Sequence, residues 1–198
     1  MSFDRNRRAD FDVVCDWVPQ GARVLDLGCG DGALLARLMT HRGARGYGVE
    51  IDDTAVIAAM DNGVNVIQSN IEGGLAFFGK KTFDIAILSQ TLQATRHTEA
   101  LINDVLAICK SAIVTLPNFG HWQVRWQLGV GGRMPVSKRL PYQWYDTPNV
   151  HFSTVNDFEA FCAEKGITIE RCAVLARGRE VKFLPNVRGE TAVFQIRR

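Results

Sequence analysis

One short segment of the chain combines glycines with carboxylates in a spacing that suits ligand binding. In residues 24–32 (VLDLGCGDG) an apolar run stops in a turn where every second residue is glycine. Leucines at helical spacing follow, so the segment predicts a buried strand, a tight turn and a helix start. Glycine lets a ligand approach the main chain, and the free N–H groups of a helix start favour a polar or anionic partner. We therefore expect a nucleotide-like ligand to be held by Asp26, Gly28, Cys29, Gly30 and Gly32.

A second acid, at the end of the next predicted strand, strengthens this interpretation. Residues 46–52 read as a strand that ends in acids, and Glu50 lies 22 residues after Gly28. This is close to the roughly 20-residue spacing of the acid that binds ribose hydroxyls in dinucleotide folds. A carboxylate only accepts hydrogen bonds, so Glu50 can take both hydroxyls of one ribose.

The glycine spacing argues against a dinucleotide. The pattern is G-x-G-x-G, because alanine occupies position 33, and Asp31 would repel a pyrophosphate. A nucleoside that has no phosphate and carries a cationic group fits better. S-adenosylmethionine, with its ribose, ammonium and sulfonium, meets that description. A purely structural turn in an unrelated α/β protein is the alternative.

The carboxyl ends of parallel strands meet at one edge of a sheet, where ligands bind beside the first strand. There the glycine turn would hold the amino-acid half of the ligand, and Glu50 would hold the ribose. Asn70 follows the third predicted strand and is placed to hydrogen-bond the adenine edge. Ile51 and Ile71 would sandwich the ring, with core packing as the alternative for both. Ser89 begins a polar segment that faces the reacting end.

Candidates for catalysis are few. Methyl transfer from a sulfonium needs mainly orientation, although some acceptors also need a general base. His121, His151 and Asp146 are the candidates for that base, and a structural hydrogen bond is an equal alternative for each. We find no paired carboxylates, nucleophile–base pair or metal-ligand spacing, so we expect no metal site. This leaves open a protein that binds the cofactor for a purpose other than catalysis.

The composition is that of a globular protein. The 198 residues carry a net charge of +2, with 46% hydrophobic and 22% charged residues, which calls for neither nucleic acid nor a membrane surface. No apolar run reaches the ~18 residues of a spanning helix, and the N-terminus lacks the apolar core of a signal peptide. The five cysteines show no C-x-x-C spacing, so we expect neither disulfides nor zinc, and a reducing cytoplasm.

Strand-like and helix-like segments alternate along the chain. This predicts a mostly parallel sheet with helices on both faces, in one domain that spans residues 1–198. Strands are expected near 23–28, 46–51, 64–68, 83–88, 112–116, 167–171 and 192–196. Helices are expected near 11–18, 31–42, 53–61 and 101–109, and after Thr154 as an N-cap.

Residues 118–152 interrupt this alternation, since they hold aromatic and basic residues, glycines and prolines without a clear period. Three interpretations remain open. The segment is a lid over a small acceptor, or a docking surface, since Trp, Tyr and Arg are enriched in binding hot spots. The third is a nucleic-acid patch with Arg125, Arg133, Lys138 and Arg139 on phosphates, which the modest net charge disfavours. Aromatics packed against the sheet edge are the plain alternative.

Several motifs carry a resemblance to known families. The chain resembles the class I S-adenosylmethionine-dependent methyltransferases at residues 24–32, 48–52 and 83–88. More particularly, it resembles the MetW family of methionine biosynthesis at ILSQTLQ (87–93), PNFGHW (117–122), GRMPV (132–136) and LPYQWYDTPN (140–149). The resemblance implies an α/β fold, the Rossmann-like class I methyltransferase fold, with a seven-stranded, mostly parallel sheet whose last strand is antiparallel.

The resemblance also implies site residues and a partner. Gly28, Gly30, Gly32 and Glu50 match the cofactor contacts of the superfamily by motif position. Asn70 departs from the superfamily, where an acid is usual, but its amide can still accept from the adenine amino group. The partner implied is MetX, the homoserine O-acyltransferase of methionine synthesis, whose activity the MetW subunit supports.

Two functions of different class follow. In the first, the protein binds S-adenosylmethionine or S-adenosylhomocysteine and supports MetX as a partner subunit, docking through residues 118–152. In the second, it methylates a small molecule covered by that segment. The family motifs within 117–149 and the missing general base favour the first.

Overall fold

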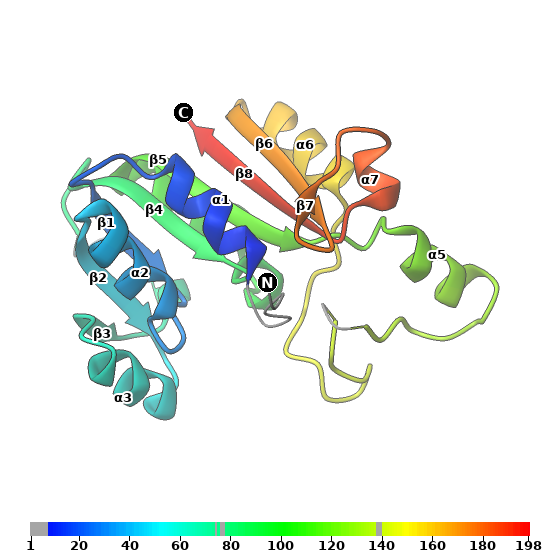
Figure 1. Ribbon diagram of the computed structural model, residues 1–198, viewed down its shortest axis with the longest axis horizontal. Helices are drawn as coiled ribbons and strands as arrows, with labels where there is room; N and C mark the ends of the chain where they lie inside the picture. The colour runs from blue at the N-terminus through cyan, green and yellow to red at the C-terminus, as the bar shows by residue number, and fades with distance from the viewer. Residues whose placement is uncertain (1–7, 74, 76–77, 138–139) are drawn as a thin grey trace, which may run out of the picture.

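The computed structural model describes residues 8–73, 75, 78–137 and 140–198, and one sheet organises them (Figure 1). Its strands are β1 (Arg23–Leu27), β2 (Arg45–Glu50), β3 (Val66–Gln68), β4 (Phe83–Ser89), β5 (Cys109–Pro117), β6 (Thr168–Ala176), β7 (Arg179–Glu180) and β8 (Thr191–Arg197). The α-helices are α1 (Ala9–Trp17), α2 (Ala33–Arg42), α3 (Asp53–Asp61), α4 (Thr98–Ile108), α5 (Trp122–Gly129), α6 (Val155–Glu164) and α7 (Pro185–Arg188). Two 3₁₀ turns, η1 (Ile71–Gly73) and η2 (Leu92–Ala94), follow β3 and β4.

The strand order across the sheet is β3-β2-β1-β4-β5-β8-β6-β7. Strands β1 to β5 pair in parallel, and β8 is antiparallel to both β5 and β6. This confirms the mostly parallel sheet with an antiparallel last strand. The expected number of strands was one too few, because the two-residue strand β7 pairs with the end of β6 at the sheet edge.

Helices cover both faces of the sheet, and alternate residues of each strand face different helices. Leu25 and Leu27 pack in a cluster with side chains of α4 and α6. Val24 packs in a second cluster with side chains of α1 and α2, which also takes in Ala59 of α3. The two layers hold the strand ends in fixed positions, so the loops at the carboxyl edge form on a rigid base.

Local sequence signals account for the starts of α3 and α6. Helix α3 begins and ends where expected, at Asp53 and Asp61, with the Asp52 side chain accepting from Ala55 N. Thr154 caps α6 in a capping box with Asp157, each side chain accepting from the other's backbone N–H. Cys109 was expected on a helix but begins β5, because α4 ends one residue earlier.

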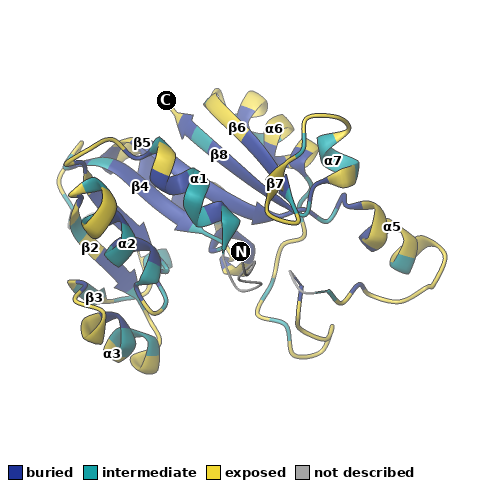
Figure 2. Ribbon diagram, viewed as in Figure 1, coloured by how far each residue is buried: buried dark blue, intermediate teal, exposed yellow. Residues whose placement is uncertain are grey.

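Residues 118–152 leave the sheet and form an extended arm (Figure 1). The sequence of this segment shows no clear period, yet the segment contains helix α5. That helix buries only Val124, so its sequence carries no apolar stripe that would reveal a helical period. Figure 2 shows that most of the arm is exposed. No helix among the described residues is long and apolar enough to cross a membrane.

Candidate functional site

The glycine turn joins β1 to α2 in a backbone conformation that favours glycine. Gly28 and Gly30 have φ of +71° and +54°. A Cβ on Gly28 would lie 2.9 Å from the Thr91 side chain, so this glycine permits a close contact within the protein. A Cβ on Gly30 would meet nothing within 4 Å. The main chain at Gly30 therefore faces open space that a ligand can enter.

The Glu50 carboxylate lies against this turn, as the sequence spacing suggests. One of its oxygens accepts from Gly30 N at 2.9 Å. The other accepts from Ile51 N at 2.7 Å and Asp52 N at 3.1 Å. These bonds fix the carboxylate beside the open face of the turn, at the ends of neighbouring strands β1 and β2. A fixed carboxylate in that position is suited to accept from ligand hydroxyls.

Asp26 sits directly before the turn and is buried without adequate pairing. It is 1% exposed, and its Oδ1 has no hydrogen-bond partner among the described residues. Burial raises the pKa of this carboxyl to about 7; the Arg8 guanidinium acts in the opposite direction, and Glu50 adds to the rise. A buried carboxylate oxygen without a donor favours a site that a cationic or N–H group completes. Burial also raises the pKa of the neighbouring Cys29 thiol to about 12, so Cys29 stays protonated.

The loop after β3 supplies the third edge of the site. Asn70 Oδ1 accepts from Glu72 N at 2.9 Å and so shapes the start of η1. Ile71 is partly buried against the core cluster of α4 and α6, which agrees with the core-packing alternative. Ile51 is 61% exposed at the end of β2 and is available to a ligand.

The loop after β4 connects the glycine turn to the arm. Thr91 Oγ1 donates to Leu27 O at 2.8 Å, directly before Gly28. Two residues later, the Gln93 carbonyl accepts from Val150 N at 2.7 Å and His151 N at 3.0 Å. Gln90, directly before Thr91, has a φ of +56°, which is strained for a residue other than glycine. No sequence pattern indicates that Thr91 packs against the glycine turn. Thr91 lies 64 positions after Leu27, the residue to which it donates.

The three candidates for a general base lie apart. His121 is buried at the N-cap of α5. Its pKa is lowered, mainly by burial; the Glu190 carboxylate acts in the opposite direction, and the Arg177 guanidinium lowers the pKa further. His151 Nε2 lies 3.4 Å from Arg96 O, and Asp146 lies exposed on the arm. Among the described residues, no hydrogen bond or ion pair joins any two of these side chains.

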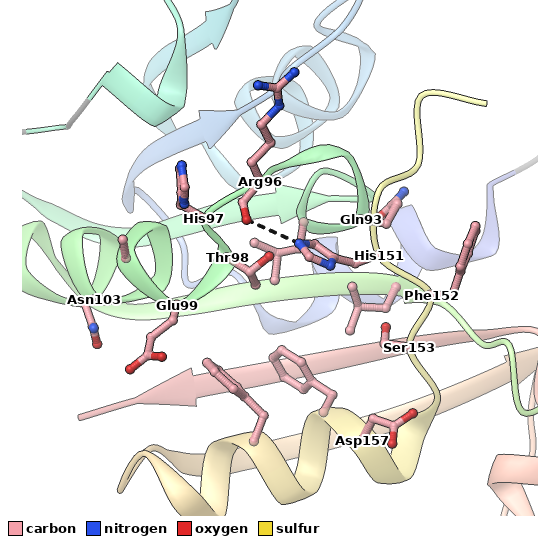
Figure 3. Close-up of a pocket in the computed structure, with 15 residues that line it drawn as sticks. Gln93, Arg96, His97, Thr98, Glu99, Asn103, His151, Phe152, Ser153 and Asp157 are labelled. Atoms are coloured by element: carbon pink, nitrogen blue, oxygen red, sulfur yellow. Dashed lines mark hydrogen bonds between the residues drawn. The ribbon is translucent and has the colours of Figure 1, made fainter. Parts of the chain in front are cut away.

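A pocket of about 800 Å³ opens beside the same loop, between the start of α4 and α6. Its floor is apolar, with Leu92, Leu116, Phe158 and Phe161 among the lining residues. His151 forms part of the wall, while the Arg96 side chain extends away from it (Figure 3). No sequence pattern indicates this pocket, because its walls come from segments about 50 positions apart.

Sequence reasoning also missed Arg8. Its Nη2 donates to Ser89 Oγ at 3.1 Å, at the end of β4. A lone arginine before a predicted helix carries no signal by itself, and only the folded chain shows its position. Lys138 and Arg139, named for a nucleic-acid patch, lie outside the described residues.

Comparison with known proteins gives a family match over most of the chain. Residues 8–196 match the model of "Methionine biosynthesis protein MetW". The "Bifunctional methionine biosynthesis protein MetXA/MetW" of Rhodopirellula baltica is 30% identical over 208 residues. That alignment covers 98% of this chain and 33% of the relative, so the chain spans about a third of the curated relative that it matches.

Solved structures share the fold. An S-adenosylmethionine-dependent methyltransferase from Mesorhizobium loti has a TM-score of 0.71 at 17% identity, covering 98% of this chain and 100% of that chain. The [4+2]-cyclase SpnF has a TM-score of 0.68 at 15% identity, covering 100% of this chain and 85% of that chain. At these identities the likeness shows the fold alone, and the different names show that one fold serves different chemistries.

Proposed function

Because the chain belongs to the MetW family of methionine biosynthesis proteins, we propose that it binds S-adenosylmethionine or S-adenosylhomocysteine and acts as a partner subunit of the homoserine O-acyltransferase MetX. The observation that carries the partner role is the exposed aromatic arm. The observation that carries the ligand is the combination of an open glycine turn, a fixed carboxylate and an incompletely paired buried acid.

The residues at the carboxyl edge fit such a ligand. Glu50 would accept from the ribose hydroxyls, Ile51 would cover one face of the adenine, and Asn70 would lie near its edge. The backbone at Gly30 leaves room for the ligand. The ligand itself supplies an electrophilic methyl group when it carries the sulfonium. The residues of this chain bind and orient it, and no described residue near the turn forms an evident nucleophile–base pair.

The arm has the composition and exposure of a docking surface. Trp126 is 63% exposed and Trp144 is 71% exposed, and Trp122 and Tyr145 are also exposed. Large aromatics at the surface of a monomer mark interaction sites, and Trp and Tyr supply much of the energy at protein interfaces. The relative in which a MetW part and a MetXA part share one chain supports MetX as the occupant.

Calorimetry tests the ligand half of the proposal. We expect S-adenosylhomocysteine to bind the protein, and Glu50→Ala to weaken binding by roughly tenfold or more, since charge-assisted hydrogen bonds are lost. No binding to the unaltered protein would contradict the ligand claim. Unchanged affinity in Glu50→Ala would remove Glu50 from the site.

Association with purified MetX tests the partner half. The alanine variants of Trp122, Trp126, Trp144 and Tyr145 should include at least one that weakens association by at least about 2 kcal/mol, roughly thirtyfold. Phe183→Ala is the matched control, because Phe183 is an equally exposed aromatic outside the arm. The arm variants should keep their affinity for S-adenosylhomocysteine. If all four arm variants associate with MetX as the unaltered protein does, the arm is not the docking surface.

The pocket beside η2 favours one second candidate, a methyltransferase that acts on a small acceptor. Its volume suits a small molecule, and Leu92 and Gln93 of the loop after β4 line it. A methyl-transfer assay on cell extract distinguishes the two functions. If Trp122→Ala abolishes methyl transfer and leaves MetX association unchanged, the arm is a substrate lid.

A further inference from the structure

The pocket between the start of α4 and α6 lies outside the glycine turn. Its volume of about 800 Å³ is within the range of small-molecule sites. None of the residues assigned above to S-adenosylmethionine lines it. Leu92 and Gln93 of its wall directly follow Thr91, which bonds Leu27 O before the turn. The pocket is therefore adjacent to the nucleoside site and separate from it.

The interior of the pocket is apolar. Leu92, Leu116 and Phe158 are buried, and Phe161 is partly buried against the same core cluster. The rings of Phe158 and Phe161 come from one face of α6, with their centroids 6.1 Å apart. An open floor of this composition favours the hydrocarbon part of a ligand, because its burial removes apolar surface from water.

The charged groups in the pocket wall favour a ligand without negative charge. Glu99 of α4 and Asp157 of α6 both line the pocket, and each carboxylate already accepts from a donor of the protein. Arg96 and His97 also belong to the wall, but their side chains extend away from the pocket (Figure 3). An anion bound here would meet two carboxylates above an apolar floor, which is unfavourable.

One polar group of the pocket is open to a ligand. Ser153 Oγ makes no hydrogen bond with a described residue, and it points into the pocket (Figure 3). The Ser153 carbonyl accepts from Phe119 N at 3.0 Å, so the backbone holds this residue in place. A hydroxyl both donates and accepts, and it therefore suits an uncharged polar group such as another hydroxyl.

We propose that this pocket binds a small uncharged molecule, with an aromatic or branched aliphatic body on the apolar floor and one polar group bonded to Ser153 Oγ. Organic anions are excluded from it. The site is different from that of S-adenosylmethionine, and its ligand is a methyl acceptor only if the second candidate function holds. The inference therefore goes beyond the proposed function and does not depend on it.

Probes that share one ring and differ in one group test each contact. Benzyl alcohol carries a hydroxyl, ethylbenzene has a methyl group in its place, and benzoate has a carboxylate. Titrations of the isotope-labelled protein followed by NMR should show benzyl alcohol binding at the pocket with a Kd of about 1 mM or lower. Benzoate should bind at least about tenfold more weakly. Ser153→Ala should weaken benzyl alcohol by about three- to tenfold, the loss of one neutral hydrogen bond, and leave ethylbenzene unchanged.

Two further variants test the location and the charge of the site. Ala100 lines the pocket from the exposed first turn of α4, so Ala100→Trp should fill it and weaken benzyl alcohol at least about tenfold. Ala107→Trp is the matched control, because Ala107 is exposed on the same helix outside the pocket. Glu99→Gln should strengthen benzoate by about two- to fivefold. Glu159→Gln should not, because Glu159 is exposed on α6 away from the pocket wall.

Several outcomes overturn the inference. If benzyl alcohol does not bind, or if Ala100→Trp and Ala107→Trp weaken it equally, the pocket is not a ligand site. Equal affinity for benzoate and benzyl alcohol contradicts the exclusion of anions, and tighter binding of benzylamine than of benzyl alcohol means that the ligand is a cation. If Ser153→Ala weakens ethylbenzene as much as benzyl alcohol, Ser153 only holds the fold. Displacement of benzyl alcohol by S-adenosylhomocysteine would make the two sites one. Failure of S-adenosylhomocysteine to bind in calorimetry would contradict the proposed function alone and leave this inference standing.

Discussion

Replacing Asp26 by asparagine should stabilise the free protein above neutral pH. Burial raises the pKa of Asp26 to about 7, against an ordinary value of 3.8. The folded state therefore binds more protons than the unfolded state between about pH 4 and 7, and stability falls as pH rises through that window. Asparagine has the same shape and no charge, so the variant avoids this loss.

The size of the effect follows from the pKa difference. A rise of about three units, at about 1.36 kcal/mol per unit, means that ionising Asp26 costs the folded state on the order of 4 kcal/mol. The stability difference between Asp26→Asn and the unaltered protein should grow by about that amount from pH 4 to pH 8. For a protein of this length, this corresponds to a difference of roughly ten degrees in Tm.

Denaturant unfolding of both proteins at several pH values between 4 and 8 measures this difference. Asp84→Asn is a control of opposite sign, because hydrogen bonds from Lys110 and Arg23 lower the Asp84 pKa to about 2. Asp84 stabilises the fold above about pH 4 and loses that contribution only between about pH 4 and 2, so Asp84→Asn should lower the free energy of unfolding by a nearly constant amount from pH 4 to 8. A stability difference for Asp26→Asn that stays constant from pH 4 to 8 would refute the reasoning.

Three further outcomes are expected. Gly30→Ala should abolish S-adenosylhomocysteine binding, as measured by calorimetry. Gly63 has a comparable left-handed backbone and equally open surroundings, so Gly63→Ala should cost about 1 kcal/mol of stability and leave binding intact. Thr154→Ala should lower the free energy of unfolding by about 1 kcal/mol in urea, because the capping box of α6 is lost. Saturating S-adenosylmethionine should change the affinity for MetX by about 1–3 kcal/mol, and MetX should change the affinity for the ligand by the same factor; identical MetX titrations with and without ligand would exclude coupling.

The expected coupling has a physical route in the loop after β4. Thr91 bonds Leu27 O at one end of this loop, and the Gln93 carbonyl bonds Val150 N and His151 N at the other. A ligand that orders the glycine turn therefore acts on a loop that also holds the return of the arm. Spatial contact alone does not prove coupling, so the reciprocal titration is the test that decides.

The sequence predicted the elements whose signals are local. The start of α3 and the cap of α6 depend on side chains within three or four positions of the helix end, and both were placed correctly. Helix α5 was missed because its sequence mixes Trp, Gln and Arg without an apolar stripe and buries only Val124. The short strand β7 was missed because two residues are too few to show a period.

For the candidate site, the difference again lies between local and distant contacts. The spacing of Gly28 and Glu50 predicted that the glycine turn and the Glu50 carboxylate lie together. The structure joins them by the hydrogen bond from Gly30 N to Glu50. Arg8 and Ser89 are 81 positions apart, and Thr91 and Leu27 are 64 apart. No pattern in a single sequence links such pairs. The fold alone brings them together, through the β1–β4 pairing and the packing of α1 on the sheet.

The cost of Asp26 in the free protein supports a role in binding. A carboxylate at the end of a buried strand, with an oxygen that no described residue bonds, opposes folding at neutral pH, and asparagine would relieve it. The neighbouring positions follow the usual rules, with Leu25 and Leu27 fully buried in the core. Asp26 departs from the rule that buried polar groups are hydrogen-bonded, whereas its neighbours in β1 are ordinary core residues. Such a departure is expected where a residue serves function at a cost in stability. An ammonium group placed against Asp26 would remove the unpaired charge. The stability lost at Asp26 in the free protein would then return as affinity for the ligand.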